Sequence, residues 1–150
     1  PDIDYDILIV WSNDMFATFY GFDDVFRECI YHARNKQGDD DFLVHFPEPD
    51  TNEILNVLFV ATKEYIDRFG YIYHPSYKSL WCDNESLDVA KLLNRYHYFD
   101  MPGLYEHRNP AYHKYGMERD DMFNEQQGHW IEDENNFKER KKRNFDLLNL

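Results

Sequence analysis

The sequence has few of the residues that cross-link or turn a chain: 2 cysteines, 6 glycines and 6 prolines in 150 residues. The cysteines, Cys29 and Cys82, are too few for a disulfide framework or a zinc knuckle, so we expect free thiols. The sequence also lacks a Gly-rich phosphate loop, a Ser/His/Asp pattern and a paired-cysteine motif. Because these motifs are absent, the sequence does not indicate a protease, a P-loop enzyme or a Rossmann dehydrogenase.

Basic residues are scarce as well. There are 16 Lys and Arg against 29 Asp and Glu, which gives a formal net charge of −13 at pH 7. Nucleic acids and anionic membrane surfaces attract proteins with a surplus of positive charge, so neither is expected as a partner. No apolar run approaches the roughly 18 residues that span a bilayer, and the start, PDIDYDILIV, lacks the basic region and cleavage site of a signal peptide. We therefore expect a cytoplasmic protein without a membrane span.

Aromatic residues and aspartate are abundant. Twelve Tyr and 12 Phe are too many for a disordered chain, and the length suits one domain covering residues 1–150. Aspartate supplies 18 of the 29 acidic residues. It favours loops, helix caps and metal sites over helix interiors, so several aspartates are candidates for function.

Short apolar runs and helical patterns alternate along the chain. Residues 5–11 form a continuous apolar run, typical of a strand buried on both faces of a parallel sheet. Helical patterns begin at Phe22, at Thr62, where Gly70 supplies a C-cap, and near Asp83. Further strands are predicted at residues 42–46, 56–61, 96–99 and 104–107, the last two around the Pro102-Gly103 turn. The pattern predicts an α/β fold with a mixed, mainly parallel sheet and flanking helices.

Asn13 and Asp14 directly follow the first predicted strand. In open α/β sheets, ligands bind at the carboxyl ends of the strands. A carboxylate there can hold a hard cation such as Mg²⁺ or Mn²⁺, which prefers oxygen ligands. Capping of the next turn is the simpler alternative for both residues.

Two more candidates lie at the ends of predicted elements. Asp83 opens a helix, where the helix dipole keeps a carboxylate ionised; it suits a general base if it faces a cleft, and a plain N-cap otherwise. His107 ends a predicted strand and is either a metal ligand or a structural histidine. The aromatic residues before Asp83, among them Tyr73 and Trp81, either fill the core or bind a sugar through apolar contact and directed hydrogen bonds.

The order of these features resembles the second half of the A-type (GT-A) nucleotide-sugar glycosyltransferases, especially the family 2-like members. The segment Ser12-Asn13-Asp14 is similar to their metal-binding Asp-x-Asp or Asp-Asp motif. The segment GYIYHPSYKSLWCDNE, which begins at Gly70, is similar to their acceptor segment, which ends in a Glu-Asp motif that opens a helix. His107 lies where these enzymes often place a third metal ligand.

This resemblance implies a metal-dependent inverting glycosyltransferase with a nucleotide-sugar donor and a carbohydrate or other hydroxyl acceptor. Asp14 and His107 would bind Mn²⁺ or Mg²⁺ at the donor diphosphate, with Asn13 beside them in the cofactor site. Asp83 would be the base that deprotonates the acceptor hydroxyl. The residues implied on the acceptor side are Trp81, Asn84 and Glu85.

The sequence departs from the family pattern at Asn13, where aspartate is usual, and at Cys82, where glutamate is usual. The family also places a nucleotide-binding half of roughly a hundred residues before the metal motif. We therefore expect this chain to be the acceptor and metal part, with the nucleotide-binding part absent or supplied by a partner chain. The alternatives are a non-catalytic glycosyltransferase-like module that binds sugars or assembles complexes, and a hydrolase that uses paired carboxylates such as Asp14 and Asp83.

Overall fold

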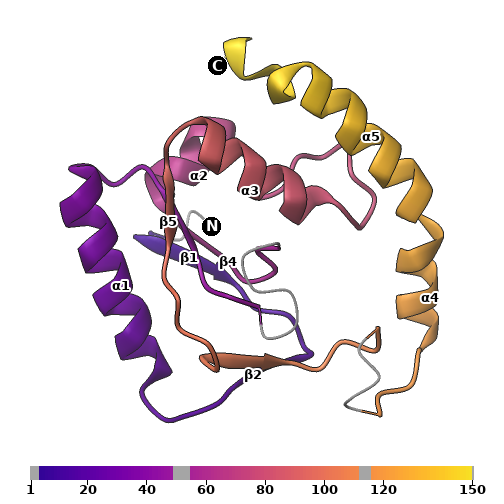
Figure 1. Ribbon diagram of the computed structural model, residues 1–150, viewed down its shortest axis with the longest axis horizontal. Helices are drawn as coiled ribbons and strands as arrows, with labels where there is room; N and C mark the ends of the chain where they lie inside the picture. The colour runs from indigo at the N-terminus through magenta and orange to yellow at the C-terminus, as the bar shows by residue number, and fades with distance from the viewer. Residues whose placement is uncertain (1–3, 49–54, 112–115, 150) are drawn as a thin grey trace.

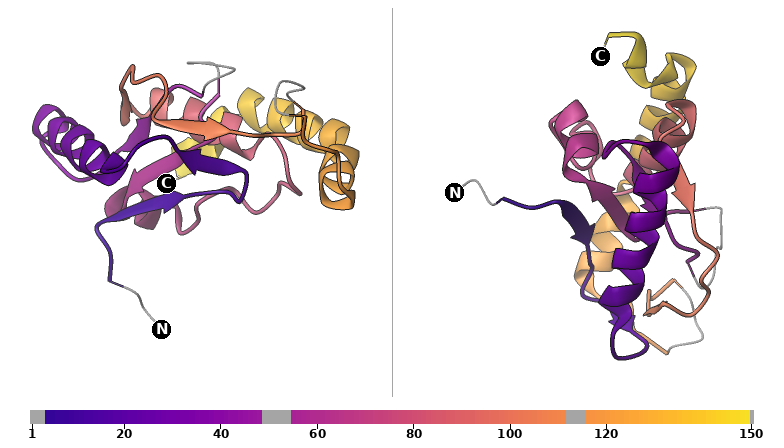
Figure 2. Two further views of the ribbon diagram at one scale, coloured as in Figure 1. Left: turned by 90° about the horizontal axis from the view of Figure 1, so that it is seen from below. Right: turned by 90° about the vertical axis from the view of Figure 1, so that its left-hand side faces the viewer.

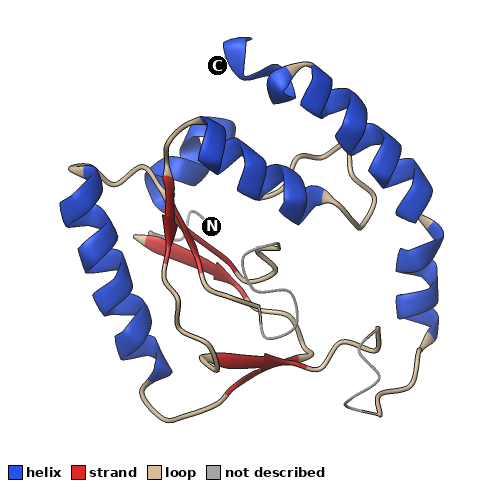
Figure 3. Cartoon of the chain, in the orientation of Figure 1, coloured by secondary structure: helices blue, strands red, loops and turns tan. Residues whose placement is uncertain are grey.

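The computed structural model describes residues 4–48, 55–111 and 116–149 (Figure 1). Helices and strands alternate along the chain, and the predicted α/β class is confirmed (Figure 3). The elements are, in order, β1 (Ile7–Val10), β2 (Met15–Ala17), α1 (Phe22–Gln37), β3 (Leu43–His45), β4 (Phe59–Thr62), α2 (Lys63–Phe69), α3 (Cys82–Leu92), β5 (Tyr96–Tyr98), β6 (Tyr105–His107), α4 (Asp121–Gly128), α5 (Trp130–Lys142) and the 3₁₀ helix η2 (Asn144–Asn149).

The main sheet has the strand order β1-β4-β3-β5. Strand β4 is antiparallel to both β1 and β3, whereas β3 and β5 are parallel. The sheet is mixed, as predicted, but the expectation of mainly parallel pairing is wrong. Parallel strands need a crossover, usually a helix, and the described part of the β3–β4 connection contains none. Because β1 and β3 both oppose β4, they run in the same direction and their carboxyl ends lie at one edge of the sheet.

Alternate residues of the strands face two separate hydrophobic layers, as the period-two geometry of a strand requires. One face packs on α1, where Val44 and Val60 meet Phe26 and Ile30. The other packs on α2 and α3, where Leu43 and Phe59 join a cluster with helix residues that include Tyr65 and Ala90. Helices therefore cover both faces of the sheet (Figure 2). The edge strand β1 is only half-buried, which corrects the prediction that it is buried on both faces.

Strands β5 and β6 do not form the expected hairpin around Pro102-Gly103. Strand β5 pairs with β3, and β6 pairs with β2 in a separate antiparallel sheet. In that second sheet Met15 lies opposite His107. The short strand β2 is not predicted from the sequence, yet it brings His107 next to the residues that follow β1.

The C-terminal helices α4 and α5 run along one side of the molecule (Figure 1). The carboxylate of Asp133 in α5 is fully buried and accepts hydrogen bonds from three backbone N–H groups in the loop before α3. The donors are Lys78, Ser79 and Leu80, at 2.8–2.9 Å. Helix α5 therefore fixes the loop that leads to Asp83.

Both cysteines are free, as expected. Burial raises the pKa of the Cys29 thiol to about 11 and that of Cys82 to about 12. Because the thiolate is the reactive form, these thiols are poor nucleophiles at neutral pH. In the described ranges, no helix has the length and apolar character needed to cross a bilayer.

The side chain of Asn56 is 1% exposed, and neither its Nδ2 nor its Oδ1 has a hydrogen-bond partner in the described structure. An unsatisfied buried polar group costs about 1–3 kcal/mol. We expect Asn56→Leu to raise the free energy of unfolding by about 1–2 kcal/mol in urea denaturation. The control is Asn35→Leu, at an exposed position of α1, which should change stability by less than about 0.5 kcal/mol. A destabilised Asn56→Leu variant would mean that a bound water satisfies the amide.

Candidate active site

His107 lies between two carboxylates at the edge of the sheet where β1 and β3 end. Its Nε2 is 3.2 Å from Oδ2 of Asp14, and its Nδ1 is 3.3 Å from Oε1 of Glu48. The side chains are 9% exposed for His107, 24% for Asp14 and 0% for Glu48. Burial alone lowers the pKa of His107, but the hydrogen bond to Glu48 and the charge of Asp14 outweigh burial and raise it above the ordinary value.

Three separate elements supply this cluster. Asp14 is in the turn between β1 and β2, and its backbone oxygen accepts a 2.8 Å hydrogen bond from the N–H of Arg108. Glu48 follows the carboxyl end of β3. His107 is the last residue of β6. The structure thus brings together Asp14 and His107, the two residues that the sequence proposed as metal ligands. Glu48 was missed, although an acidic residue that follows a buried strand is the same signal that pointed to Asp14.

Asp83 lies in the first turn of α3. It is not the N-cap: Trp81 occupies that position with a left-handed φ of 66°. Oδ1 of Asp83 accepts a 2.9 Å hydrogen bond from the N–H of Asn84. Burial raises the pKa of Asp83 to about 6, although backbone N–H groups and the charge of His107 lower it.

Glu85 and Trp81 take part in packing α3 against α5. Glu85 is 4% exposed and forms an ion pair with Arg140, with Nε–Oε2 at 2.7 Å and Nη2–Oε1 at 2.8 Å. Trp81 packs on Trp130 and Phe137, with ring centroids 5.5 and 5.3 Å apart. Both side chains therefore belong to the packing of α3 against α5.

Asn13 and Asn84 adjoin the two candidate carboxylates along the chain. Asn13 is exposed in the turn before Asp14, so its side chain is open to solvent beside the pair. Asn84 is partly buried next to Asp83, and its backbone N–H donates the 2.9 Å hydrogen bond to the Asp83 carboxylate. Both asparagines therefore stay candidates for contact with a ligand.

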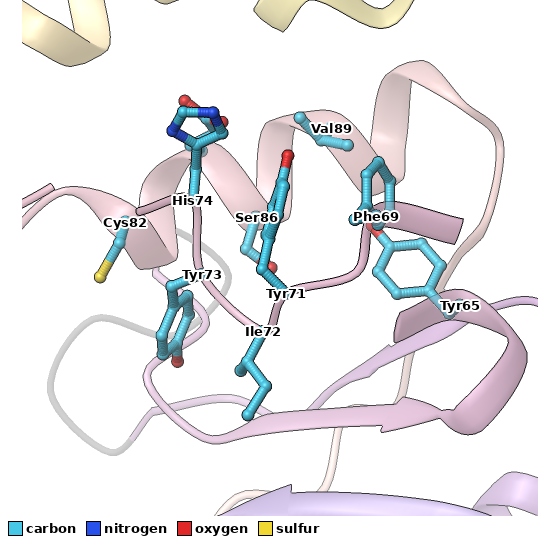
Figure 4. Close-up of a pocket in the computed structure, with 10 residues that line it drawn as sticks. Tyr65, Phe69, Tyr71, Ile72, Tyr73, His74, Cys82, Ser86 and Val89 are labelled. Atoms are coloured by element: carbon cyan, nitrogen blue, oxygen red, sulfur yellow. The ribbon is translucent and has the colours of Figure 1, made fainter. Parts of the chain in front are cut away.

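A cavity lies between the segment that follows α2 and helix α3 (Figure 4). It has room of about 20 Å³, enough for one water molecule. Tyr71 and Tyr73 point to opposite sides of the segment (Figure 4), and Tyr73 packs on Phe59 of β4, with ring centroids 5.4 Å apart. The cavity is too small for a sugar ring, so these tyrosines do not build the acceptor pocket within it.

In the described parts of the chain, no group of three or more His, Cys, Asp or Glu side chains is placed to hold a metal ion. The Asp14–His107 pair nevertheless fits two adjacent ligands of one cation. Ligands at 2.0–2.1 Å in an octahedral shell lie about 3 Å apart, and the two atoms are 3.2 Å apart. Mg²⁺ commonly takes one or two protein ligands and completes its shell with substrate phosphates and water.

One fold hosts many activities, so the function of a protein depends on the chemistry of its site and not on the fold class. The site offers a carboxylate and an imidazole 3.2 Å apart, and the first turn of α3 carries a carboxylate with a raised pKa. Compared with protein-family models, with curated proteins and with solved structures, this chain has no match.

Proposed function

We propose that this chain is the metal- and acceptor-side part of a metal-dependent inverting glycosyltransferase, which moves a sugar from a nucleotide-sugar donor to an acceptor hydroxyl. The observation that carries the proposal is the 3.2 Å approach of Asp14 and His107, and the raised pKa of Asp83 supports it. These are the residues to which the GT-A resemblance gives the metal and base roles. Asp14 and His107 are far apart in the sequence, so the fold, and not local sequence, brings these two side chains together.

Asp14 and His107 would hold Mn²⁺ or Mg²⁺ through Oδ2 and Nε2. When bound, the cation would neutralise the charge that develops on the departing nucleoside diphosphate. This chain carries a net charge of −13, so a bound cation would also reduce repulsion between the protein and the donor diphosphate. A proton on Nε2 occupies the same position between the two side chains, and protons and the cation therefore compete for it.

Asp83 would act as the general base. With a pKa of about 6, it is ionised at pH 7.5 yet more basic than an ordinary aspartate, which favours proton transfer from a hydroxyl. It would take the acceptor proton as the acceptor oxygen attacks the anomeric carbon from the face opposite the diphosphate. The new C–O bond forms while the bond to the diphosphate breaks, and the electron pair leaves with the diphosphate. A single displacement of this kind inverts the anomeric centre.

Calorimetric titration with Mn²⁺, alone and with UDP or GDP, tests the proposal. We expect the wild-type chain to bind Mn²⁺ through the Asp14–His107 pair, and Asp14→Asn or His107→Gln to weaken binding at least tenfold, because each removes one of two protein ligands. The affinity should fall at low pH, since His107 must lose its Nε2 proton and its pKa is raised.

The matched controls for this titration are Asp24→Asn and His32→Gln, two exposed positions on α1. They remove the same chemical groups at a distance from the site and should leave Mn²⁺ affinity unchanged. Wild-type protein that binds no Mn²⁺ under any of these conditions contradicts the proposal, and so does unchanged binding by the Asp14 and His107 variants.

The second candidate is the non-catalytic glycosyltransferase-like module. It is favoured by two residues, Asn13 and Cys82, which stand where the family has acidic side chains. Cys82 cannot replace a carboxylate, because burial raises its pKa to about 12 and keeps it neutral. Binding of a nucleotide sugar without release of nucleoside diphosphate, in the presence of Mn²⁺ and acceptors, would favour this module over the enzyme.

A further inference from the structure

We propose that Glu48 is the positioning residue of His107: its carboxylate accepts the Nδ1–H hydrogen bond and thereby fixes the tautomer in which the Nε2 lone pair faces Asp14. Glu48 belongs to none of the motifs that suggested the active site. Its role follows from two carboxylates placed on either side of one imidazole ring, of which only that of Glu48 is fully buried.

A neutral imidazole has a single N–H, and here two carboxylates compete for it. The Glu48 side chain is fully buried, whereas that of Asp14 is 24% exposed. A hydrogen bond withheld from a buried carboxylate costs more than one withheld from a carboxylate that water reaches. The proton of the neutral ring therefore resides on Nδ1, next to Glu48.

This tautomer has a consequence for the opposite side of the ring. With the proton on Nδ1, the Nε2 lone pair and Oδ2 of Asp14 are two electron-rich atoms 3.2 Å apart. Such a contact is repulsive unless a positive charge lies between the atoms. Glu48 thus turns the Asp14–His107 pair into a position for a cation, and a carboxylate behind the ring also makes Nε2 a stronger ligand. This step, unlike the tautomer itself, rests on the proposed function.

Nitrogen-15 NMR of the histidine rings, at an alkaline pH where His107 is neutral, reads the tautomer directly. The chain has 7 histidines, and the His107 signals are assigned by their loss in His107→Gln. We expect the Nδ1–H form in wild-type protein. In Glu48→Met, which keeps side-chain length but has no acceptor for this hydrogen bond, we expect the Nε2–H form to predominate, because Asp14 remains as an acceptor on that side.

The matched control is Glu106→Gln. Glu106 neighbours His107 on β6, but its side chain is 42% exposed and pairs with Arg108. The variant makes the same charge change beside the ring without touching it, so the tautomer should stay as in wild type. In Glu48→Gln, the neutral amide is a weaker acceptor than a carboxylate, and a measurable fraction of the Nε2–H form is expected. This variant decides the question if Glu48→Met does not fold, and a tautomer ratio equal to wild type then overturns the proposal.

Mn²⁺ titration of the same variants separates this inference from the proposed function. We expect Glu48→Met to lower Mn²⁺ affinity about 10–100-fold, with a smaller loss in Glu48→Gln and none in Glu106→Gln. If the tautomer changes but even wild-type protein binds no Mn²⁺, Glu48 positions His107 and the metal function is wrong. If Mn²⁺ binds through Asp14 and His107 but the Glu48 variants keep the wild-type tautomer, the positioning role is overturned and the metal function stands.

Discussion

Replacing Asp83 with asparagine is expected to abolish sugar transfer while making the folded protein more stable at neutral pH. A positioned general base contributes about 10²–10⁴-fold to a rate, and asparagine cannot accept the acceptor proton. The stabilisation has a separate origin. Burial raises the pKa of Asp83 from 3.8 to about 6, which means that the folded state disfavours the ionised carboxylate by up to about 3 kcal/mol at pH 7.

The pH dependence of the stabilisation has a definite sign. Below about pH 4, Asp83 is protonated in both the folded and the unfolded chain and costs nothing. Between pH 4 and 6 the unfolded chain ionises first, so the stability of wild-type protein falls relative to Asp83→Asn. Above pH 6 both states are ionised and the difference is constant. Urea denaturation at pH 4, 5, 6 and 7.5 should show the gain of Asp83→Asn appearing across this range.

Asp88→Asn is the control for this prediction, because Asp88 is on the same helix and forms an ion pair with Lys141 near the surface. It should change stability by less than about 1 kcal/mol. Transfer, measured as release of nucleoside diphosphate once the nucleotide-binding part is supplied, should rise with pH to a plateau above about 6 in wild-type protein. Two results would contradict the assignment of Asp83 as the base: a variant that is less stable than wild type at pH 7.5, or one that still transfers sugar.

The elements whose signals are local were predictable from the sequence. Helix α2 ends where Gly70 adopts a left-handed φ of 70°, and α1 carries acidic residues in its first turn. The direction of the strands was not predictable, because β1 pairs with β4, some fifty residues away. An apolar run has the same appearance at the edge and in the middle of a sheet. Nothing in residues 5–11 indicates whether the strand lies at the edge or in the middle of the sheet.

The candidate site residues also divide into those with a local sequence signal and those without one. Asp14 and Asp83 adjoin element boundaries that the sequence marks, so they could be proposed before the structure was known. Glu48 could not be linked to His107, which is 59 residues further along the chain. For Glu85, the sequence suggested a role, but it gave no sign of the residue that holds the side chain. Its place after Asp83 suggested substrate contact, but its carboxylate is held by Arg140, 55 residues away, and no pattern near Glu85 predicts that partner.

The buried pair of Glu85 and Arg140 leads to the second large prediction. Arg140→Met is expected to lower the free energy of unfolding by about 3–5 kcal/mol, because it leaves the charge of Glu85 buried without its partner. The side chains of Arg140 and Glu85 are 6% and 5% exposed, so water cannot replace the lost guanidinium. Tyr77 also donates a 2.7 Å hydrogen bond to Glu85, but a phenol does not neutralise a carboxylate. Urea denaturation measures the loss.

Two further variants identify the cause of that loss. Lys141→Met, at the next position of α5, breaks the more exposed ion pair with Asp88 and should cost at most about 1 kcal/mol. The double variant Glu85→Leu/Arg140→Met removes both buried charges and should recover most of the stability, since an apolar pair of similar volume replaces an ion pair at little cost. If the double variant is as unstable as Arg140→Met, the loss comes from packing and not from the unpaired charge.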